Sequence, residues 1–249
     1  MKGLPEVCTQ LHDIIADLSD WKADCVRSKD VSDSVLLHGP PGTGKTMLAE
    51  ALAGSAGAHF IATSYTDLQA AGHLGDYLKA MAMVVAEAMA RAPSVIFFDE
   101  LDSFGTRTRD PSSGNSRYMT AVINDLLQQL TRLNAAEGVI VIAATNHLDH
   151  IDPAILRAGR FDMTLRVPMP DKAGVRDILA HHFGTEIEVE EAIVTTLLGK
   201  SGADLAHIAQ DAKARATGAN IPDRRAPPPD SCRPRPAGLR KASPPNRCP

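Results

Sequence analysis

Short apolar runs alternate with helix-like segments along the first two thirds of the chain. Two runs, 95–98 and 139–144, are apolar at every position, which is typical of strands buried on both faces of a parallel sheet. Shorter runs predict further strands over 35–37, 58–63 and 163–167. Apolar spacing and strong helix formers predict helices over 4–21, 47–53, 77–91 and 119–133. This order of elements predicts an α/β fold built on a parallel sheet.

The C-terminal third has a different pattern. Three short helical patterns follow Pro168 and Pro170, over residues 173–183, 189–198 and 203–216. Residues 218–249 hold nine Pro, seven Lys or Arg and only two Asp, so we predict that this tail is disordered. The predicted domains are therefore 1–170, an all-α domain over 171–217, and a Pro/Arg-rich tail over 218–249.

Two segments between the predicted elements are expected to be loops. Residues 67–75 contain glycines, and residues 105–117 are polar and rich in turn formers. The three methionines of the helix over 77–91 lie at near-helical spacing and are predicted to fill the core, namely Met81, Met83 and Met89.

A glycine-rich segment links the first predicted strand to the next helix. Residues 39–46 fit the pattern G-x-x-x-x-G-K-[ST] in the strand, loop, helix context that a phosphate-binding loop requires. Such a loop turns its N–H groups toward a polyphosphate at the positive end of a helix. We expect Lys45 to reach the β and γ phosphates of ATP. The candidate nucleotide-binding residues here are Gly39, Pro40, Pro41, Gly42, Thr43, Gly44, Lys45, Thr46 and Met47.

Two carboxylates end the strand over 94–99. Asp99 and Glu100 follow four large apolar residues, at the end of the strand where open α/β sheets bind ligands. We expect Mg²⁺ to be held by the Thr46 hydroxyl and by Asp99, and we expect Glu100 to act as general base toward the attacking water. The alternative is that the two acids simply begin a solvated loop.

Three more residues are candidates for catalysis. Asn146 ends the strand over 139–144 at the same sheet edge, where its amide can position water, or merely cap the next turn. Asp152 and Pro153 predict the start of a helix, on which Arg157 and Arg160 would share one face. Two guanidinium groups suggest phosphate stabilisation from a neighbouring subunit, although spacing alone favours a surface ion pair equally.

Charge and cysteine content narrow the function classes. The net charge of −4 gives no basic field, so nucleic acid is not an expected partner. No apolar run approaches the roughly 20 residues of a membrane helix, and the N-terminus lacks the apolar stretch of a signal peptide. We therefore expect a cytoplasmic protein that does not contact a membrane. The four cysteines form no C-x-x-C pair, so neither a zinc site nor a disulfide framework is indicated.

Taken together, the motifs resemble the AAA family of ATPases, most closely the ATPase module of bacterial AAA proteins and AAA proteases. The resemblance rests on residues 39–46, on Phe-Phe-Asp-Glu-Leu-Asp-Ser, on Ala-Ala-Thr-Asn and on Ile-Asp-Pro-Ala-Ile-Leu-Arg-Ala-Gly-Arg-Phe-Asp, in that order. It implies a three-layer α/β P-loop domain with a parallel sheet, followed by a small helical lid. It also implies a homo-oligomeric ring, usually a hexamer, with nucleotide between subunits.

The same resemblance assigns roles to individual residues. Asn146 takes the sensor position, and Arg157 and Arg160 take the positions of arginine fingers that act in trans. Gly202 and Ala203 belong to a segment that resembles the part of the family's lid near the nucleotide.

This chain departs from the family pattern in two places. The family's first pore loop usually carries an aromatic, a hydrophobic residue and Gly, whereas the corresponding segment here is Gly72-His73-Leu74-Gly75. We expect its grip on an extended polypeptide to be weaker. The lid is expected to lack its final helix, because the tail over 218–249 follows directly.

We therefore expect an ATPase that uses ATP and Mg²⁺ to remodel a protein substrate as an oligomer. Two alternatives stay open. An incomplete lid is compatible with a nucleotide-binding regulatory subunit with little hydrolysis. A DNA-remodelling ATPase of the wider AAA+ superfamily would need a basic channel, which the net charge does not suggest.

Overall fold

Five parallel strands form the centre of the fold. They are β1 (Ser34–His38), β2 (His59–Ser64), β3 (Ser94–Asp99), β4 (Val139–Thr145) and β5 (Met163–Arg166). The order across the sheet is β2-β3-β4-β1-β5, and every neighbouring pair runs parallel. The register places Leu36 beside Ala143 and Phe97 beside Ile142. All five predicted strands are confirmed, and so is the α/β P-loop fold class.

This computed structural model describes residues 5–22, 34–105, 114–184 and 189–216. The chain divides into two units, Met1–Gln210 and Asp211–Pro249. The sheet belongs to the first unit. Of the second unit the structure describes only residues 211–216, which continue a helix, so the predicted tail over 218–249 lies outside the described residues.

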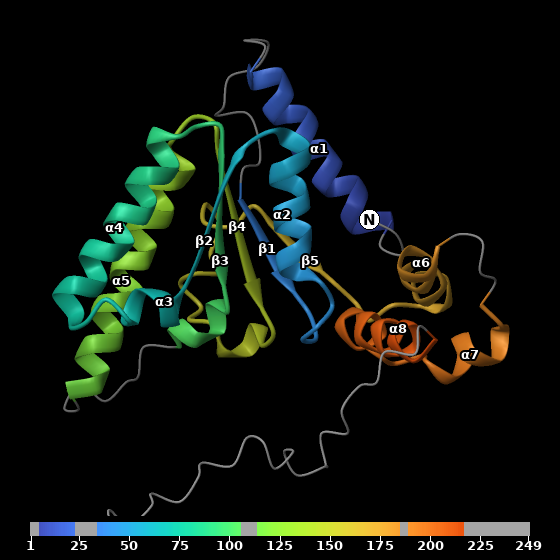
Figure 1. Cartoon of the computed structure of the whole chain (residues 1–249). Helices are drawn as coiled ribbons and strands as arrows, with labels where there is room; N and C mark the ends of the chain where they lie inside the picture. Colours follow the sequence, from blue (N-terminus) through green and yellow to red (C-terminus); the bar gives the residue numbers. More distant parts are fainter. Residues whose placement is uncertain (1–4, 23–33, 106–113, 185–188, 217–249) are drawn as a thin grey trace, which may run out of the picture. The chain divides into compact units, whose positions relative to one another are not determined.

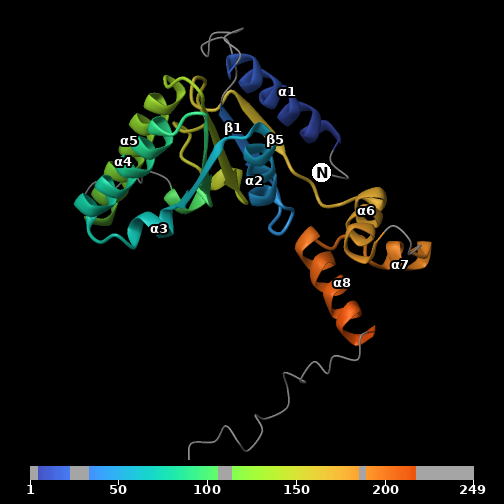
Figure 2. The same ribbon diagram turned by 45° about the horizontal axis from the view of Figure 1, so that its top comes forward.

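Two layers of helices cover the two faces of the sheet (Figure 1). One face carries α1 (Pro5–Lys22) and α2 (Lys45–Ala56), and the other carries α4 (Leu74–Ala90) and α5 (Gly114–Asn134). The pairs stay on opposite sides of the strands in the turned view of Figure 2. Each of the inner strands β1, β3 and β4 feeds both layers, because successive side chains point to opposite faces. Phe98 and Val141 join the α4/α5 cluster, whereas Phe97 and Ile142 join the α1/α2 cluster.

Part of the segment predicted as a loop over 67–75 is helical. Residues Tyr65–Gln69 form α3, and α4 already begins at Leu74. The cause is a local cap, because the Ser64 hydroxyl accepts a hydrogen bond from the Asp67 N–H at 3.1 Å. The second predicted loop, 105–117, is wrong at its end, since α5 begins at Gly114. Residues 106–113 lie outside the described residues.

The predicted helix after Asp152 does not form. Asp152 closes a single turn, in which its Oδ1 accepts from the Ala154 N–H at 2.9 Å and its carbonyl from the Ile155 N–H at 2.9 Å. Residues 153–160 then continue as turns, and Gly159 has a φ of +84°. The argument that Arg157 and Arg160 share one helical face is therefore wrong.

The methionine prediction holds for only one of three residues. Met81 is fully buried on α4, whereas Met83 is 72% and Met89 39% exposed. The buried stripe of α4 runs through Tyr77, Met81, Val85 and Ala88, and the other two methionines lie off that stripe.

Three helices follow the sheet, as predicted. They are α6 (Lys172–Phe183), α7 (Glu191–Thr196) and α8 (Gly202–Ala216). A small separate cluster joins them through Val175, Leu179, Val194, Leu205 and Ala209. Asp171 caps α6 by accepting from the Gly174 N–H at 2.7 Å. Within the described parts of the chain, no helix combines the length and the apolar character needed to cross a bilayer.

Candidate active site

The loop over 39–46 runs from the end of β1 to the start of α2 and depends on its glycines. Gly39 has a φ of +151°, and a Cβ there would lie 2.1 Å from the Val167 carbonyl oxygen. Gly44 is left-handed, with a φ of +92°, and directly precedes α2. A side chain at either position would force the backbone to move. The loop therefore delivers Lys45 and Thr46 as the first residues of the helix.

Lys45 is buried, and its ammonium group has three hydrogen-bond acceptors. Its ammonium donates to the Gly39 carbonyl at 2.7 Å, to the Pro40 carbonyl at 2.9 Å and to Asn146 Oδ1 at 2.8 Å. Burial lowers the pKa of Lys45, and the charges of Asp99 and Asp102 oppose that shift. Two residues predicted to meet the γ phosphate thus lie in direct contact. Phosphate oxygens, being anionic, are stronger acceptors for this ammonium than the neutral oxygens it now holds.

The other loop residues predicted to bind nucleotide surround Lys45. The Thr43 hydroxyl donates to the Pro40 carbonyl at 2.9 Å, Pro41 and Gly42 are exposed, and Met47 is 72% exposed in the first turn of α2. Beside the loop, burial and then the charges of Arg166 and Lys45 lower the pKa of His38, which favours the neutral ring.

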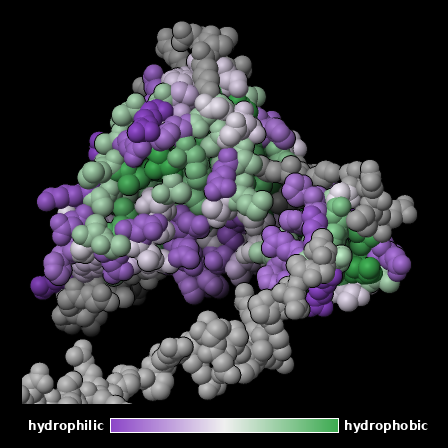
Figure 3. Space-filling model, in the orientation of Figure 1, coloured by the Kyte–Doolittle hydropathy of each residue, from purple (hydrophilic) through white to green (hydrophobic). Residues whose placement is uncertain are grey.

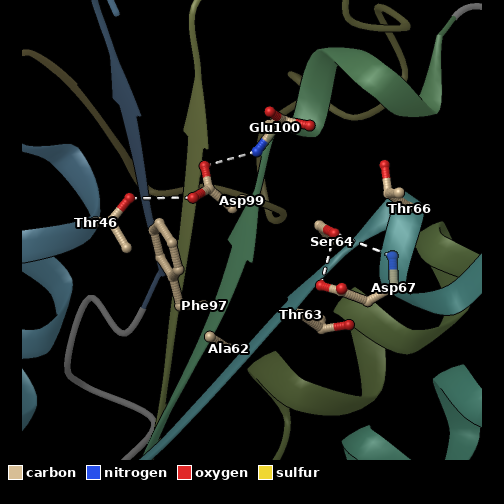
Figure 4. Close-up of a pocket in the computed structure, with 9 residues that line it drawn as sticks. All are labelled: Thr46, Ala62, Thr63, Ser64, Thr66, Asp67, Phe97, Asp99 and Glu100. Atoms are coloured by element: carbon tan, nitrogen blue, oxygen red, sulfur yellow. Dashed lines mark hydrogen bonds between the residues drawn. The ribbon is translucent and has the colours of Figure 1, made fainter. Parts of the chain in front are cut away.

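Thr46 and Asp99 meet across the gap between α2 and β3 (Figure 4). The Thr46 hydroxyl donates to Asp99 Oδ2 at 3.0 Å, and Asp99 Oδ1 accepts from the Glu100 N–H at 2.8 Å. Hydroxyl and carboxylate oxygens are hard ligands, and Mg²⁺ is commonly held by one or two such groups together with waters and phosphate oxygens. The donor set at this point therefore fits Mg²⁺.

Glu100 has a strained backbone. Its φ and ψ are both 50°, and it is the one residue other than glycine with positive φ in the described parts of the chain. Such a conformation costs on the order of 1–3 kcal/mol and persists only where the surroundings impose it. Strain of this kind concentrates at functional sites. The carboxylate is exposed and lines a cavity.

The cavity lies between the ends of β2 and β3 and has a volume of about 500 Å³, within the range of ligand pockets. Figure 4 shows its lining, which is mostly small and polar: Thr46, Ala62, Thr63, Ser64, Thr66, Asp67, Phe97, Asp99 and Glu100. The residues on the β2 side of the cavity, Ser64 to Asp67, were not among the predicted site residues. The spacing of Ser64 and Asp67, a helix-capping pattern after a strand, was a signal that could have found it.

Two further residues beside the site, Asp102 and Thr145, were not among those predicted from the sequence. Asp102 Oδ1 accepts from the Thr145 hydroxyl at 2.8 Å and from the Asn146 N–H at 3.4 Å. A hydroxyl that ends a doubly buried strand and a third acid close behind Asp99 were the available signals. These contacts tie the end of β4 to the 3₁₀ turn η2 (Leu101–Phe104).

The lid segment touches the phosphate-binding loop. The Ala203 N–H donates to the Gly42 carbonyl at 3.1 Å, and a Cβ on Gly42 would lie 2.6 Å from Ser201 Oγ. Gly202, which lies between Ser201 and Ala203, is also close to the loop, since a Cβ there would lie 3.3 Å from the Gly42 carbonyl oxygen. Both lid residues predicted to lie near the nucleotide therefore border the loop.

The two arginines are not brought to this cluster. Among the described residues, no hydrogen bond or ion pair joins the side chain of Arg157 or Arg160 to the loop or to the acids. Arg157 is exposed. Arg160 is half-buried, and its backbone is held by Asn134 of α5, whose Nδ2 donates to the Gly159 carbonyl at 3.3 Å and the Arg160 carbonyl at 2.9 Å.

The segment predicted to correspond to a pore loop is tied to the fold. His73 directly precedes α4, and the half-buried Leu74 packs against the core cluster beneath α4 and α5. Its one bulky apolar side chain thus already has packing partners.

The polar character of the sheet edge is visible on the surface. Figure 3 shows hydrophilic side chains gathered at the lower end of the sheet region, which is the end where β3 and β4 finish in Figure 1. Carboxyl ends of parallel strands are where α/β folds bind ligands.

Comparison with known proteins agrees with this geometry. Residues 35–169 match the model of the ATPase family associated with various cellular activities (AAA). The chain is 37% identical over 84% of its length to the ATP-dependent zinc metalloprotease FtsH 1 of Symbiobacterium thermophilum, and covers 36% of that protein. It is 37% identical, again over 84%, to the mitochondrial inner membrane i-AAA protease supercomplex subunit YME1 of Saccharomyces cerevisiae, and covers 28% of it.

A third relative is named as a nucleotidase rather than a protease. The proteasome-activating nucleotidase of Saccharolobus islandicus is 36% identical over 84% of this chain, which covers 54% of that protein. The chain thus spans between about a quarter and about a half of the length of these relatives. The matched family and the P-loop architecture agree, and we conclude that the chain belongs to the AAA family of ATPases.

Proposed function

We propose that this chain binds ATP with Mg²⁺ and hydrolyses it to drive the remodelling of a protein. The observation that carries the proposal is the convergence of three pairs at one sheet edge: Lys45 with Asn146, Thr46 with Asp99, and Asp99 with the strained Glu100. Protein remodelling is supported by the relatives, one named as an ATP-dependent protease and another as a proteasome-activating nucleotidase.

Binding falls to the loop and the start of α2. Its N–H groups and the Lys45 ammonium would hold the phosphates, and Thr46 and Asp99 would hold the metal. Bound Mg²⁺ would neutralise charge that develops on the β and γ phosphate oxygens. Gly202 and Ala203 border the loop through Gly42 and would close one side of the nucleotide site.

Hydrolysis needs a base and a positioning group. The Glu100 carboxylate is exposed to the cavity and would take the proton from the attacking water. The Asn146 amide, held near Lys45 Nζ, would orient that water against the γ phosphate. Both groups leave the sheet at the same edge.

The cationic groups that stabilise the transferred phosphoryl group would come from a second copy of the chain. Within the described residues of one copy, neither Arg157 nor Arg160 contacts the loop, and Arg157 is exposed. A head-to-tail contact that brings Arg157 of one copy to Lys45 of the next generates a ring when its rotation closes. We propose a homo-oligomer, with six copies as the expected number. We further propose that it works in the cytoplasm.

The test is steady-state ATP turnover with Mg²⁺ as a function of protein concentration. We expect the rate per chain to rise steeply as copies assemble, and we expect Lys45→Ala to lose both nucleotide binding and turnover. Tight ATP binding by a monomer without turnover would overturn the proposal and favour the regulatory subunit. Turnover that depends on DNA and falls with added salt would instead favour the DNA-remodelling alternative.

A further inference from the structure

The end of β4 extends past the strand that supports it. The β3–β4 ladder ends at the Phe98–Ala143 pair, whereas β4 continues to Thr145, directly before Asn146. On its other side, β4 stays paired with β1 up to His38 and Thr145, and the Gly39 N–H donates to the Thr145 carbonyl at 3.3 Å. On the side that faces β3, Thr145 and Asn146 therefore have no ladder partner among the described residues.

Asp102 occupies this side. One oxygen, Oδ1, accepts from both the Thr145 hydroxyl at 2.8 Å and the Asn146 N–H at 3.4 Å. Thr145 is 1% exposed, and its hydroxyl oxygen in turn accepts from the His147 N–H at 3.0 Å. The Thr145 hydroxyl thus links Thr145 to His147, the residues on either side of Asn146, and it donates to the Asp102 carboxylate.

Asn146 carries the effect of these contacts to the candidate active site. Its Oδ1 accepts from Lys45 Nζ at 2.8 Å, so a shift of the Asn146 backbone would move an amide that already touches the phosphate-binding lysine. Misplacement of a positioning group by about 1 Å can cost a factor of about 10² in rate.

We propose that Asp102 and Thr145 are positioning residues for Asn146, and that they set the rate of ATP hydrolysis through the placement of its amide rather than through ATP binding. This inference rests on the proposed function. Neither side chain needs to touch the nucleotide, because the Thr145 hydroxyl and the Asp102 carboxylate already satisfy each other.

The central variant is Thr145→Val, which keeps the shape of the side chain and removes its O–H donor. We expect kcat to fall about 10- to 100-fold while the Kd for ATP with Mg²⁺ stays within about threefold. Thr145→Ser restores the donor, and we expect it to recover kcat to within about threefold of the wild type. Ser94→Ala is the matched control, since it removes a buried hydroxyl bonded to the Ala88 carbonyl at the opposite end of the sheet and should lower stability without lowering kcat.

A double-mutant cycle with Asn146→Ala separates positioning from a merely structural role. If Thr145 acts through Asn146, adding Thr145→Val to Asn146→Ala should change kcat by less than about twofold, because residues that act as a unit are not additive. A full further loss in that background would overturn the inference, as would Thr145→Val with wild-type kcat. Should Thr145→Val fail to fold, Asp102→Ala removes the same contact from the more exposed side and enters the same cycle. An inactive wild-type chain would instead contradict the proposed function.

Discussion

Polar groups at the carboxyl edge of the sheet have hydrogen-bond partners, whereas several buried ones in the layer of α4 and α5 do not. At the edge, Lys45, Thr46, Asp99 and Thr145 each have a hydrogen-bond partner within 3.0 Å. In the described residues, the buried side-chain atoms without a partner all belong to α4, α5 or the segment that α5 holds: Tyr77 OH, Asp125 Oδ2, Asn134 Oδ1 and Arg160 Nη1.

The two regions therefore differ in how fully the hydrogen-bonding groups are satisfied within one copy of the chain. A buried polar atom without a partner costs about 1–3 kcal/mol, and few survive in native structures without a reason. The edge has its groups paired within one chain, as expected for a preformed nucleotide site. The Arg160 guanidinium keeps one buried donor, Nη1, without a partner among the described residues, so this segment is less fully satisfied than the sheet edge.

The largest expected effect comes from removing the exposed arginine. We expect Arg157→Ala to lower ATP turnover by about 10³, because an arginine finger supplies charge stabilisation of that size. The Kd for ATP should be unchanged, since this arginine does not contact the loop of its own chain. The measurement is kcat together with calorimetric ATP binding.

Arg91→Ala is the matched control for that variant. Arg91 is also exposed, and among the described residues its side chain pairs with His59 and Glu87 beside the opposite end of the sheet. We therefore expect the turnover of Arg91→Ala to stay within about twofold of the wild type. Equal turnover of Arg157→Ala and Arg91→Ala would show that the arginine segment has no part in hydrolysis.

A smaller effect is expected from loosening the arginine segment. Asn134→Ala removes the amide that donates to the Gly159 and Arg160 carbonyls, and we expect kcat to fall about tenfold through misplacement of the arginines. ATP binding should not change. If instead both kcat and ATP affinity stayed at wild-type values, the anchoring contact would have no functional role.

Asp125, on α5, allows the unpartnered polar groups of this layer to be tested through the pH dependence of stability. Burial raises the pKa of Asp125, against the Gln129 hydrogen bond and the Arg132 charge that lower it. A raised pKa means that folding favours the neutral acid, so the ionised carboxylate destabilises the fold at neutral pH and the cost disappears as the pH falls toward the ordinary aspartate pKa. We expect Asp125→Asn to raise stability by about 1 kcal/mol at neutral pH.

Thermal unfolding at a series of pH values checks this expectation. The gain corresponds to a Tm higher by about 2–4 °C, and it should shrink steadily in acid. A gain that stayed constant with pH, or a loss of stability at neutral pH, would contradict a raised pKa of Asp125.

The smallest effect is expected at the unpartnered phenol. Tyr77 is fully buried and its hydroxyl has no partner among the described residues, so removing that hydroxyl leaves no new group unsatisfied. We expect Tyr77→Phe to change the free energy of unfolding by less than about 1 kcal/mol, toward higher stability. Denaturant unfolding measures it, and a loss of several kcal/mol would mean that the hydroxyl does have a partner.

The sequence predicted those features that depend on local pattern. The strands follow from apolar runs, and the positions of Lys45, Asp99 and Asn146 at one edge follow from the rule that parallel strands end together. The structure brings these three residues together as that rule requires.

The features that the sequence did not reveal depend on tertiary contacts or on local competition. Asp102 and Thr145 meet only through the register of β3 and β4, which no local pattern encodes. The turn after Asp152 carries a correct capping signal, yet only turns follow it, and Gly159 among them takes a left-handed conformation. The burial of Asp125 against α4 was likewise invisible, since an aspartate on a helix usually faces solvent.

A mixing experiment tests most directly whether one copy completes the site of another. Glu100→Gln chains lack the base and Arg157→Ala chains lack the finger, so each variant alone should be nearly inactive. When the two variants are mixed in equal amounts and assemble at random, about a quarter of the contacts pair an intact base with an intact arginine. We therefore expect turnover to recover to as much as about a quarter of the wild-type rate. A mixture no more active than the separate variants, with both shown to bind ATP and to assemble, would contradict the account.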